Sequence, residues 1–344
     1  MRPRFHPRLV NDPLGDPGLY VPLAHDRRAL LFDLGDLDPL SARDILRISH
    51  IFVTHTHMDH FCGLDHLLRI CLGRPKTLYL FGPGGFLANV EGKLAAYTWN
   101  LVSTYQDSLE LVVTEVRADE RLRQTYDCRD GFQPQQPPRR APAGGPLLEE
   151  ASLQVHSAIL DHGIPCLGFS LKERYHINII SQELQAMGLA TGRWLQAFKR
   201  ALYAKAPPDR LIEAPCSDRP GRTRTYPLGA LAARIAAITP GQKIAYVADV
   251  AFHEANARRI RALAHDADHL FVEGKRGHPS SANWVISRRN GSASPISAPS
   301  SSRGGFASQG NQRRRHRSTG ARGATSATAS ISGVWTSRNV PPSR

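Results

Sequence analysis

Three histidines and one aspartate within six residues form the stretch of this sequence with the clearest chemistry. After one threonine, the apolar run 51–53 is followed by His55, His57, Asp59 and His60. Two histidines spaced i, i+2 in an extended segment lie on one side of it and can share one metal ion. Asp59 and His60 follow in a turn and can reach a second ion. Imidazole and carboxylate groups are the usual ligands of zinc and similar divalent cations, so the stretch predicts a two-metal site. A solvated polar turn, the alternative, does not explain this spacing.

Further ligands for such a site must come from distant strands. Asp249 ends the apolar run 244–248, where a strand-end carboxylate can contact both ions, although a helix N-cap before Ala251 is an alternative. His162 follows the predicted strand 153–160 and is the best third histidine for the first ion, with a packed loop histidine as the alternative. Asp33 ends another apolar strand, and taken alone it is equally typical of a turn.

The elements that must position these residues alternate along residues 1–274, which predicts an α/β domain. The predicted strands are 29–32, 51–53, 77–81, 109–116, 153–160, 167–171, 177–180, 244–248 and 269–272. The predicted helices are 64–72, 86–101, 182–204, 228–238 and 251–264. Strands 167–171 and 177–180 are expected to be partners. Residues 131–146 are rich in Pro and Gly and predict a surface loop.

The net charge of +14 is unevenly distributed. Residues 274–344 hold 12 of the 44 Lys and Arg and no acidic residue, which leaves 32 basic against 30 acidic side chains before them. The body is therefore nearly neutral, and its charge does not by itself indicate RNA binding. The segment 275–344 is rich in Ser, Arg, Gly and Ala and is expected to be a disordered basic tail. Either it contacts nucleic acid non-specifically, or it is an out-of-frame reading of a GC-rich gene.

The cysteines and the lengths of the apolar runs indicate the cellular compartment of the protein. The five cysteines contain no CxxC pair, so we expect free thiols in a reducing environment. No apolar run reaches the roughly 18 residues of a membrane span, and residues 1–10 lack the apolar core of a secretory signal. We therefore expect a cytoplasmic protein without a membrane partner.

The pattern HxHxDH after an apolar strand, together with Asp33 in Asp-Leu-Gly, resembles the metallo-β-lactamase superfamily. The resemblance implies an α/β fold of the αββα sandwich type, here lacking its normal C-terminal part. It implies two Zn²⁺ per chain, with Mn²⁺ as an alternative. His55, His57 and His162 would hold the first ion; Asp59, His60 and a shared Asp249 would hold the second. Asp33 and Glu273 would orient the ligands without touching metal.

Within that superfamily, His162 followed by Pro165 and a Leu-Gly-Phe strand resembles ribonuclease Z, the tRNA 3′-processing endonuclease. This implies an endoribonuclease that cleaves tRNA precursors on the 3′ side with metal-activated hydroxide, with Asp59 as ligand and general base. RNA is then the expected partner, and association with a second copy of the chain stays open.

Two features of ribonuclease Z are not found in the sequence, and we therefore expect the chain to lack the projecting arm and the final metal-binding histidine. The segment 182–206 lacks the Gly-Pro of the arm that grips tRNA; the basic residues in it could form a remnant surface or an ordinary solvated helix face, and they are Arg193, Lys199, Arg200 and Lys205. Neither His278 nor His316 fits the final metal ligand. Two alternatives therefore stay open: a hydrolase of the same fold acting on a small phosphodiester, sulfate or thioester, and a catalytically impaired chain.

Overall fold

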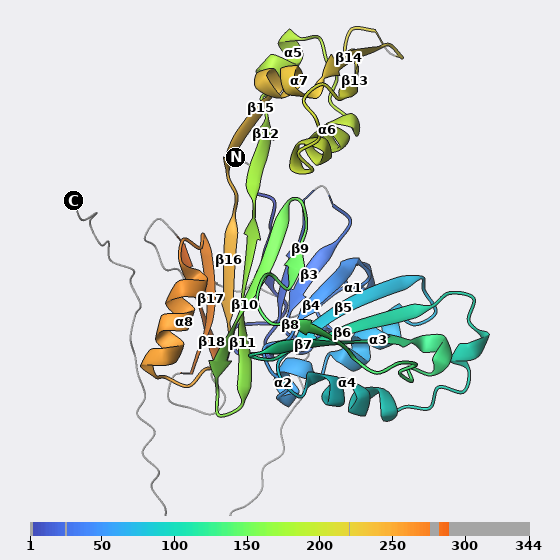
Figure 1. Cartoon of the computed structure of the whole chain (residues 1–344), viewed down its shortest axis with the longest axis vertical. Helices are drawn as coiled ribbons and strands as arrows, with labels where there is room; N and C mark the ends of the chain where they lie inside the picture. The colour runs from blue at the N-terminus through green and yellow to red at the C-terminus, as the bar shows by residue number, and fades with distance from the viewer. Residues whose placement is uncertain (1–2, 25, 220, 276–281, 289–344) are drawn as a thin grey trace, which may run out of the picture.

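Two β-sheets packed face to face form the body of the molecule (Figure 1). The computed structural model describes residues 3–24, 26–219, 221–275 and 282–288. The first sheet has eight strands in chain order: β1 (Arg8–Leu9), β2 (Leu19–Pro22), β3 (Ala29–Phe32), β4 (Ile48–Phe52), β5 (Lys76–Gly82), β6 (Leu109–Val116), β7 (Glu120–Asp127) and β8 (Arg139–Pro142). The second has the order β18 (Ala282–Arg288), β17 (His269–Lys275), β16 (Lys243–Val247), β11 (Pro165–Glu173), β10 (Leu153–Asp161) and β9 (Leu148–Glu149).

The central strands β3 to β6 run parallel, and helices make their crossovers. These helices are α1 (Ala42–Arg47), α2 (Met58–Phe61), α3 (Leu64–Cys71) and α4 (Phe86–Ala95), followed by the 3-10 turn η1 (Val102–Thr104); η2 (Cys128–Asp130) follows β7. Leu64, Leu67, Leu68 and Cys71 are the buried side of α3, at the spacing that predicts an amphipathic helix. Parallel strands end at the same edge of a sheet, so residues that follow β3 and β4 come together there.

Three apolar layers define the architecture. One lies between α1, α3 and α4 and the first sheet, and contains Ile51, Leu64 and Phe86. A second lies between the sheets, where Phe32 and Phe52 stack with ring centroids 5.1 Å apart. The third packs α8 (Glu254–Ala264) on the outer face of the second sheet. The order helix, sheet, sheet, helix confirms the expected metallo-β-lactamase-type αββα sandwich.

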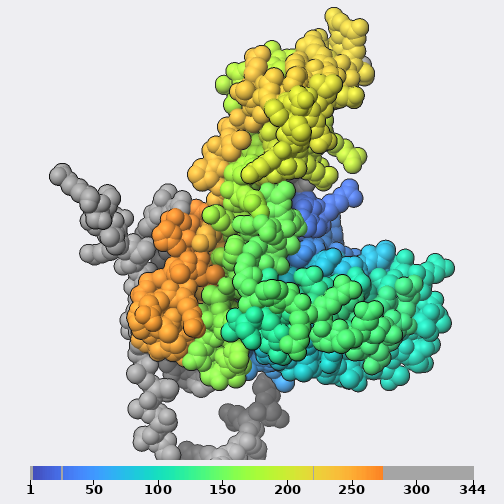
Figure 2. All heavy atoms as spheres, viewed as in Figure 1, coloured from blue at the N-terminus to red at the C-terminus, as the bar shows by residue number. Residues whose placement is uncertain are grey.

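Residues 175–240, here called the arm, project from the body (Figures 1 and 2). Strands β12 (Tyr175–Ile179) and β15 (Ala236–Pro240) pair antiparallel as its stalk. Its head contains α5 (Ser181–Ala186), α6 (Trp194–Tyr203), β13 (Leu211–Pro215), β14 (Thr223–Pro227) and α7 (Leu228–Ile235). The head has its own apolar core, which includes Leu184, Phe198 and Leu231. The expectation that the chain lacks a projecting arm is therefore wrong.

Two further expectations for this region are also wrong. Strand β12, predicted as 177–180, pairs with β15 and not with the strand containing 167–171. The helix predicted over 228–238 ends at Ile235, and residues 236–240 continue as a strand. The Ala-rich sequence Ala236-Ala237 continues the helical pattern, and only pairing with the distant β12 decides that this segment is extended.

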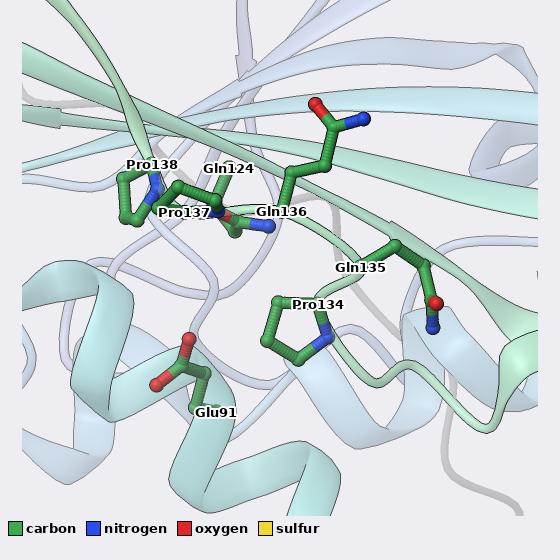
Figure 3. A pocket seen from close by; sticks show the side chains of 7 residues that line it. All are labelled: Glu91, Gln124, Pro134, Gln135, Gln136, Pro137 and Pro138. Atoms are coloured by element: carbon green, nitrogen blue, oxygen red, sulfur yellow. The ribbon is translucent and has the colours of Figure 1, made fainter.

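The Pro-rich loop 131–146 lies at the surface, as expected. Its last part forms strand β8, whose four residues are all exposed. Pro134, Gln135 and Gln136 line a hollow of about 390 Å³ together with Glu91 of α4 and Gln124 of β7 (Figure 3). None of the helices in the described residues combines the length and apolar character that a membrane span needs.

The segment 275–344 lies mostly outside the described residues. Within it, the backbone of residues 282–288 forms β18, antiparallel to β17. The division of the chain at residue 274 and the disorder of the tail stay predictions.

Candidate metal centre

The predicted ligands meet at the ends of strands from both sheets. His55 follows β4, and His57 is the N-cap of α2, so the sequence turns from strand to helix within the ligand segment. His162 follows β10, and Asp249 follows β16. The two sheets face each other, so these strand ends bring together residues that are more than 100 positions apart in the chain.

A first cluster contains His55, His57, His162 and Asp249, each with a ligand atom within 4.8 Å of the others. His55 Nε2 lies 3.8 Å from Asp249 Oδ2 and 2.9 Å from His57 Nδ1, and His162 Nε2 lies 3.5 Å from the same Asp249 oxygen. Three imidazoles and one carboxylate at these distances are a ligand set that suits zinc. These are the residues that the sequence assigned to the first ion, together with the shared Asp249.

A second cluster contains His60, Asp249 and Glu273. His60 Nε2 lies 3.5 Å from Asp249 Oδ2 and 4.0 Å from Glu273 Oε2. Asp59 lies at the solvent side of this cluster: its side chain is 53% exposed, and its Oδ2 is 3.8 Å from His60 Nε2. Asp249 belongs to both clusters, as a bridging carboxylate would. Glu273, expected only to orient a ligand, lies where it can itself bind a cation.

Two buried atoms in the second cluster lack hydrogen-bond partners among the described residues. They are His60 Nε2 and Glu273 Oε2. A buried polar atom without a partner costs about 1–3 kcal/mol, so two facing the same point indicate a missing ligand. A divalent cation bound between them would satisfy both. The residues present therefore fit the metal that the motif implies.

The electrostatics of the site also favour a cation. Burial, followed by repulsion from Asp249, raises the pKa of Glu273 to about 7. Burial alone would lower the pKa of His60, but Asp33, Asp249 and Glu273 raise it to about 10. Burial and the neighbouring His60 lower the pKa of His55 to about 3, so its imidazole is neutral and free to bind metal. The carboxylates thus create a buried site in need of positive charge.

Asp33 is completely buried and fixes the orientation of His60. It accepts hydrogen bonds from the Thr54 backbone N–H at 2.6 Å, the Thr54 hydroxyl at 3.0 Å and the Tyr246 hydroxyl at 2.9 Å. Its Oδ2 also lies 2.9 Å from His60 Nδ1. A carboxylate on Nδ1 fixes the imidazole tautomer that leaves Nε2 free for metal. This is the orienting role expected for Asp33.

The backbone at the site is strained at two aspartates, Asp33 and Asp249. Asp33 and Asp249 have φ values of 60° and 31°, in a region that residues other than glycine rarely adopt. Close packing maintains the nearby turns: a Cβ added to Gly63 would lie 2.1 Å from the carbonyl oxygen of Gly35. Such strain persists only where the surroundings over-determine it, and it concentrates at functional sites.

Sequence reasoning missed Thr54 and Tyr246 and underrated Glu273. A hydroxyl beside a histidine motif is a weak signal for Thr54, while Tyr246 looks like an ordinary strand residue. His278 and His316, weighed for the final ligand, lie outside the described residues.

The αββα sandwich with histidine and carboxylate clusters at its strand ends is the arrangement of the metallo-β-lactamase class. No family model matches the chain. Within that class, the sequence is similar to ribonuclease Z. The enzyme of that name from Deinococcus radiodurans is 26% identical over 272 residues, covering 78% of this chain and 77% of that protein.

Other relatives carry the same name. Ribonuclease Z of Halalkalibacterium halodurans is 26% identical over 267 residues, covering 72% of this chain and 67% of that protein. Ribonuclease Z of Anoxybacillus flavithermus is 30% identical over 157 residues, which span 45% of this chain and 40% of that protein. Among solved structures, the short form of human tRNase Z matches 46% of this chain and 59% of its own, with 22% identity and a TM-score of 0.29. The resemblance to ribonuclease Z expected from the motif is confirmed by the sequence relatives.

Proposed function

We propose that this chain is a metal-dependent endoribonuclease of the ribonuclease Z type, which cleaves tRNA precursors on their 3′ side. The observation that carries the proposal is the pair of ligand clusters that share Asp249 at the ends of both sheets. Similarity to proteins named ribonuclease Z along most of the chain supports RNA as the substrate.

In the proposed reaction, the residues of the site have three roles: binding metal, accepting a proton and orienting His60. One ion would be held by His55, His57 and His162, and the other by Asp59, His60 and Glu273, with Asp249 common to both. A bound pair of Zn²⁺ or Mn²⁺ ions supplies the charge that activates water at neutral pH and stabilises the negative oxygens of the phosphate. Asp59 combines exposure with proximity to His60, so its carboxylate can accept the proton of the attacking water. Asp33 keeps His60 oriented throughout.

The position of Glu273 matters for the alternative that the chain is catalytically impaired. The sequence leaves the second ion without a final histidine, and Glu273 occupies a position from which a carboxylate can replace it. Carboxylate oxygen is an accepted zinc and manganese ligand, so the site needs no residue from the tail.

The arm favours a large substrate over a small one. A head with its own core on a stalk adds nothing to a site at strand ends that binds a small diester. Of the four basic residues noted in the sequence, Arg193, Arg200 and Lys205 are exposed on the head, where they can contact phosphates. Lys199 is half-buried, and burial lowers its pKa. We therefore prefer RNA to a small phosphodiester, sulfate or thioester.

The test is cleavage of a 3′-extended tRNA precursor with added zinc or manganese. The wild-type chain should release the 3′ extension, while Asp59→Ala should not. Asp38→Ala is the matched control, because it removes an exposed carboxylate that pairs with His66 away from both clusters. Equal cleavage by Asp59→Ala and the wild type would exclude this site. Hydrolysis of bis(p-nitrophenyl) phosphate without cleavage of the tRNA precursor would favour the small-substrate alternative.

A further inference from the structure

A hollow of about 420 Å³ lies at one seam between the two sheets, apart from the metal ligands. Its walls come from the β6–β7 turn, the loop 143–145, the edge of β10 at 157–159, and Arg259 of α8. Arg117, Arg121 and Arg259 line it, and in the part of the chain that the structure describes no Asp or Glu does. We call it the arginine hollow.

Two of its three guanidinium groups keep uncompensated charge. Arg117 pairs with Glu115 at 2.6 Å and with Glu120, so its charge is neutralised. Among the described residues, Arg121 donates only to backbone carbonyls: Pro146 O at 2.9 Å, Gly145 O at 2.7 Å and Gly144 O at 2.6 Å. Its Nε is buried and has no partner among the described residues.

Arg259 has the same character on the opposite wall. It donates from Nη1 to Ile159 O at 3.0 Å, and its side chain is exposed. Carbonyl acceptors fix the position of a guanidinium but do not cancel its charge. The hollow therefore presents two oriented cations, which is the arrangement that favours phosphate.

The glycine loop beside Arg121 also carries backbone donors. Gly144 and Gly145 have φ values of 91° and 69°, and a Cβ at either would meet nothing within 4 Å. Their carbonyls are taken by Arg121, whereas neither amide N–H has an acceptor within the part of the chain that the structure describes. Consecutive free amides in such a loop are suited to binding an anion.

The hollow and the metal site are joined by one strand. Ile159 precedes His162 by three residues along β10 and its end, roughly 10 Å at about 3.3 Å per residue. One strand of a double helix advances about 3.4 Å per nucleotide along the axis, and an unpaired strand is more extended, so at most about three nucleotides span this distance. The volume can hold a nucleotide unit but not a duplex.

We propose that the arginine hollow binds the phosphate backbone of a single-stranded stretch of RNA, at most about three nucleotides from the bond that is cut. The proposal rests on the proposed function, because it treats the strand that reaches the metal site as RNA. It gives Arg259 and Arg121 the role of substrate-binding residues that touch neither metal nor the scissile phosphate.

The test compares Arg259→Gln with Arg258→Gln in the full chain. Arg258 is the neighbouring exposed arginine on the same helix and does not line the hollow, so both variants lose one charge and keep the same tail. Binding of a labelled single-stranded RNA oligonucleotide is followed by fluorescence anisotropy in EDTA, which prevents metal-dependent cleavage. Titrations at about 50 to 200 mM salt give the salt dependence.

We expect Arg259→Gln to weaken binding several-fold and to reduce the logarithmic salt slope by about 0.7, the value for one phosphate contact on a single strand. Arg258→Gln should stay within about twofold of the wild type. Equal affinities and slopes for the two variants would overturn the proposal. This binding comparison does not depend on catalysis. If the wild type fails to cleave a tRNA precursor, the proposed function is refuted. The comparison of the two variants still decides whether the arginine hollow binds RNA.

Discussion

Replacing Asp33 with Asn tests whether the site depends on one imidazole tautomer. The side chain keeps its shape but loses its charge, and the atom at the Oδ2 position becomes an NH₂ donor in the most direct replacement. That position faces the Thr54 hydroxyl, the Tyr246 hydroxyl and His60 Nδ1. The two hydroxyls can rotate to accept a hydrogen bond. His60 can accept one only by moving its proton to Nε2, which then cannot bind metal.

The expected loss of metal affinity follows from this change of tautomer. Partners that orient metal ligands typically contribute 10–100-fold in metal affinity, which is about 1.4–2.8 kcal/mol. The loss should fall on the second ion, since the first cluster does not contain His60. The fold should survive, because the Thr54 backbone N–H keeps its acceptor, Oδ1.

The assay is a competition titration with a chromophoric chelator, with a thermal melt as the check on folding. Tyr246→Phe is the control: it removes one hydrogen bond to Asp33 without reversing the tautomer, so metal affinity should change less than about threefold on a scale of about 1.4 kcal/mol per tenfold. If folded Asp33→Asn binds two equivalents as tightly as the wild type, the tautomer argument is refuted.

Four further outcomes are expected. Glu273→Gln should reduce tightly bound metal from two equivalents to one by elemental analysis after dialysis; two retained equivalents would mean that another residue completes the site. Phe198→Ala removes a completely buried ring from the core of the arm head, at a cost of about 3–5 kcal/mol, so limited proteolysis should cut the arm while metal content is kept; simultaneous loss of metal would contradict a separate core. Burial lowers the pKa of His50 to about 4, below the usual 6.5. The unfolded state therefore takes up the proton first as pH falls, and stability should drop by roughly 3 kcal/mol between pH 6.5 and 4 in denaturant titrations; His50→Phe should lessen that drop, and an unchanged pH profile would be evidence against it. Deleting 289–344 removes nine Lys and Arg and should weaken the salt dependence of RNA binding without lowering the melting temperature; a lower melting temperature would mean that the tail packs on the body.

The HxHxDH motif could be recognised from the sequence because its metal-binding residues are close neighbours in the chain. His55, His57, Asp59 and His60 lie within one strand-to-helix turn, so spacing alone indicates which side chains can converge. Residues such as Tyr246 contribute through contacts made across the sandwich. Its hydroxyl reaches Asp33, 213 positions earlier, and nothing about a tyrosine in an apolar strand signals such a partner.

The arm shows the same limit at the scale of elements. The segment predicted as helical over 182–204 contains α5 and α6, because apolar spacing determines these helices locally. Whether they pack on the body or project from it depends on the pairing of β12 with β15. That pairing joins segments about 60 residues apart, and the sequence of 236–240 is equally compatible with one more turn of α7.

The way the arm joins the body has a consequence for how such a chain can change. Lys172 of β11 and Lys243 of β16 are direct partners in the sheet, so the excursion between them leaves and returns at one point. Glu173 and Gln242 close that point with a backbone hydrogen bond of 2.8 Å. A short turn could take the place of the whole excursion without altering the register of either strand. The head is thus exchangeable: recombination or design can replace it with another insert while the two-sheet body and its ligand clusters stay as they are.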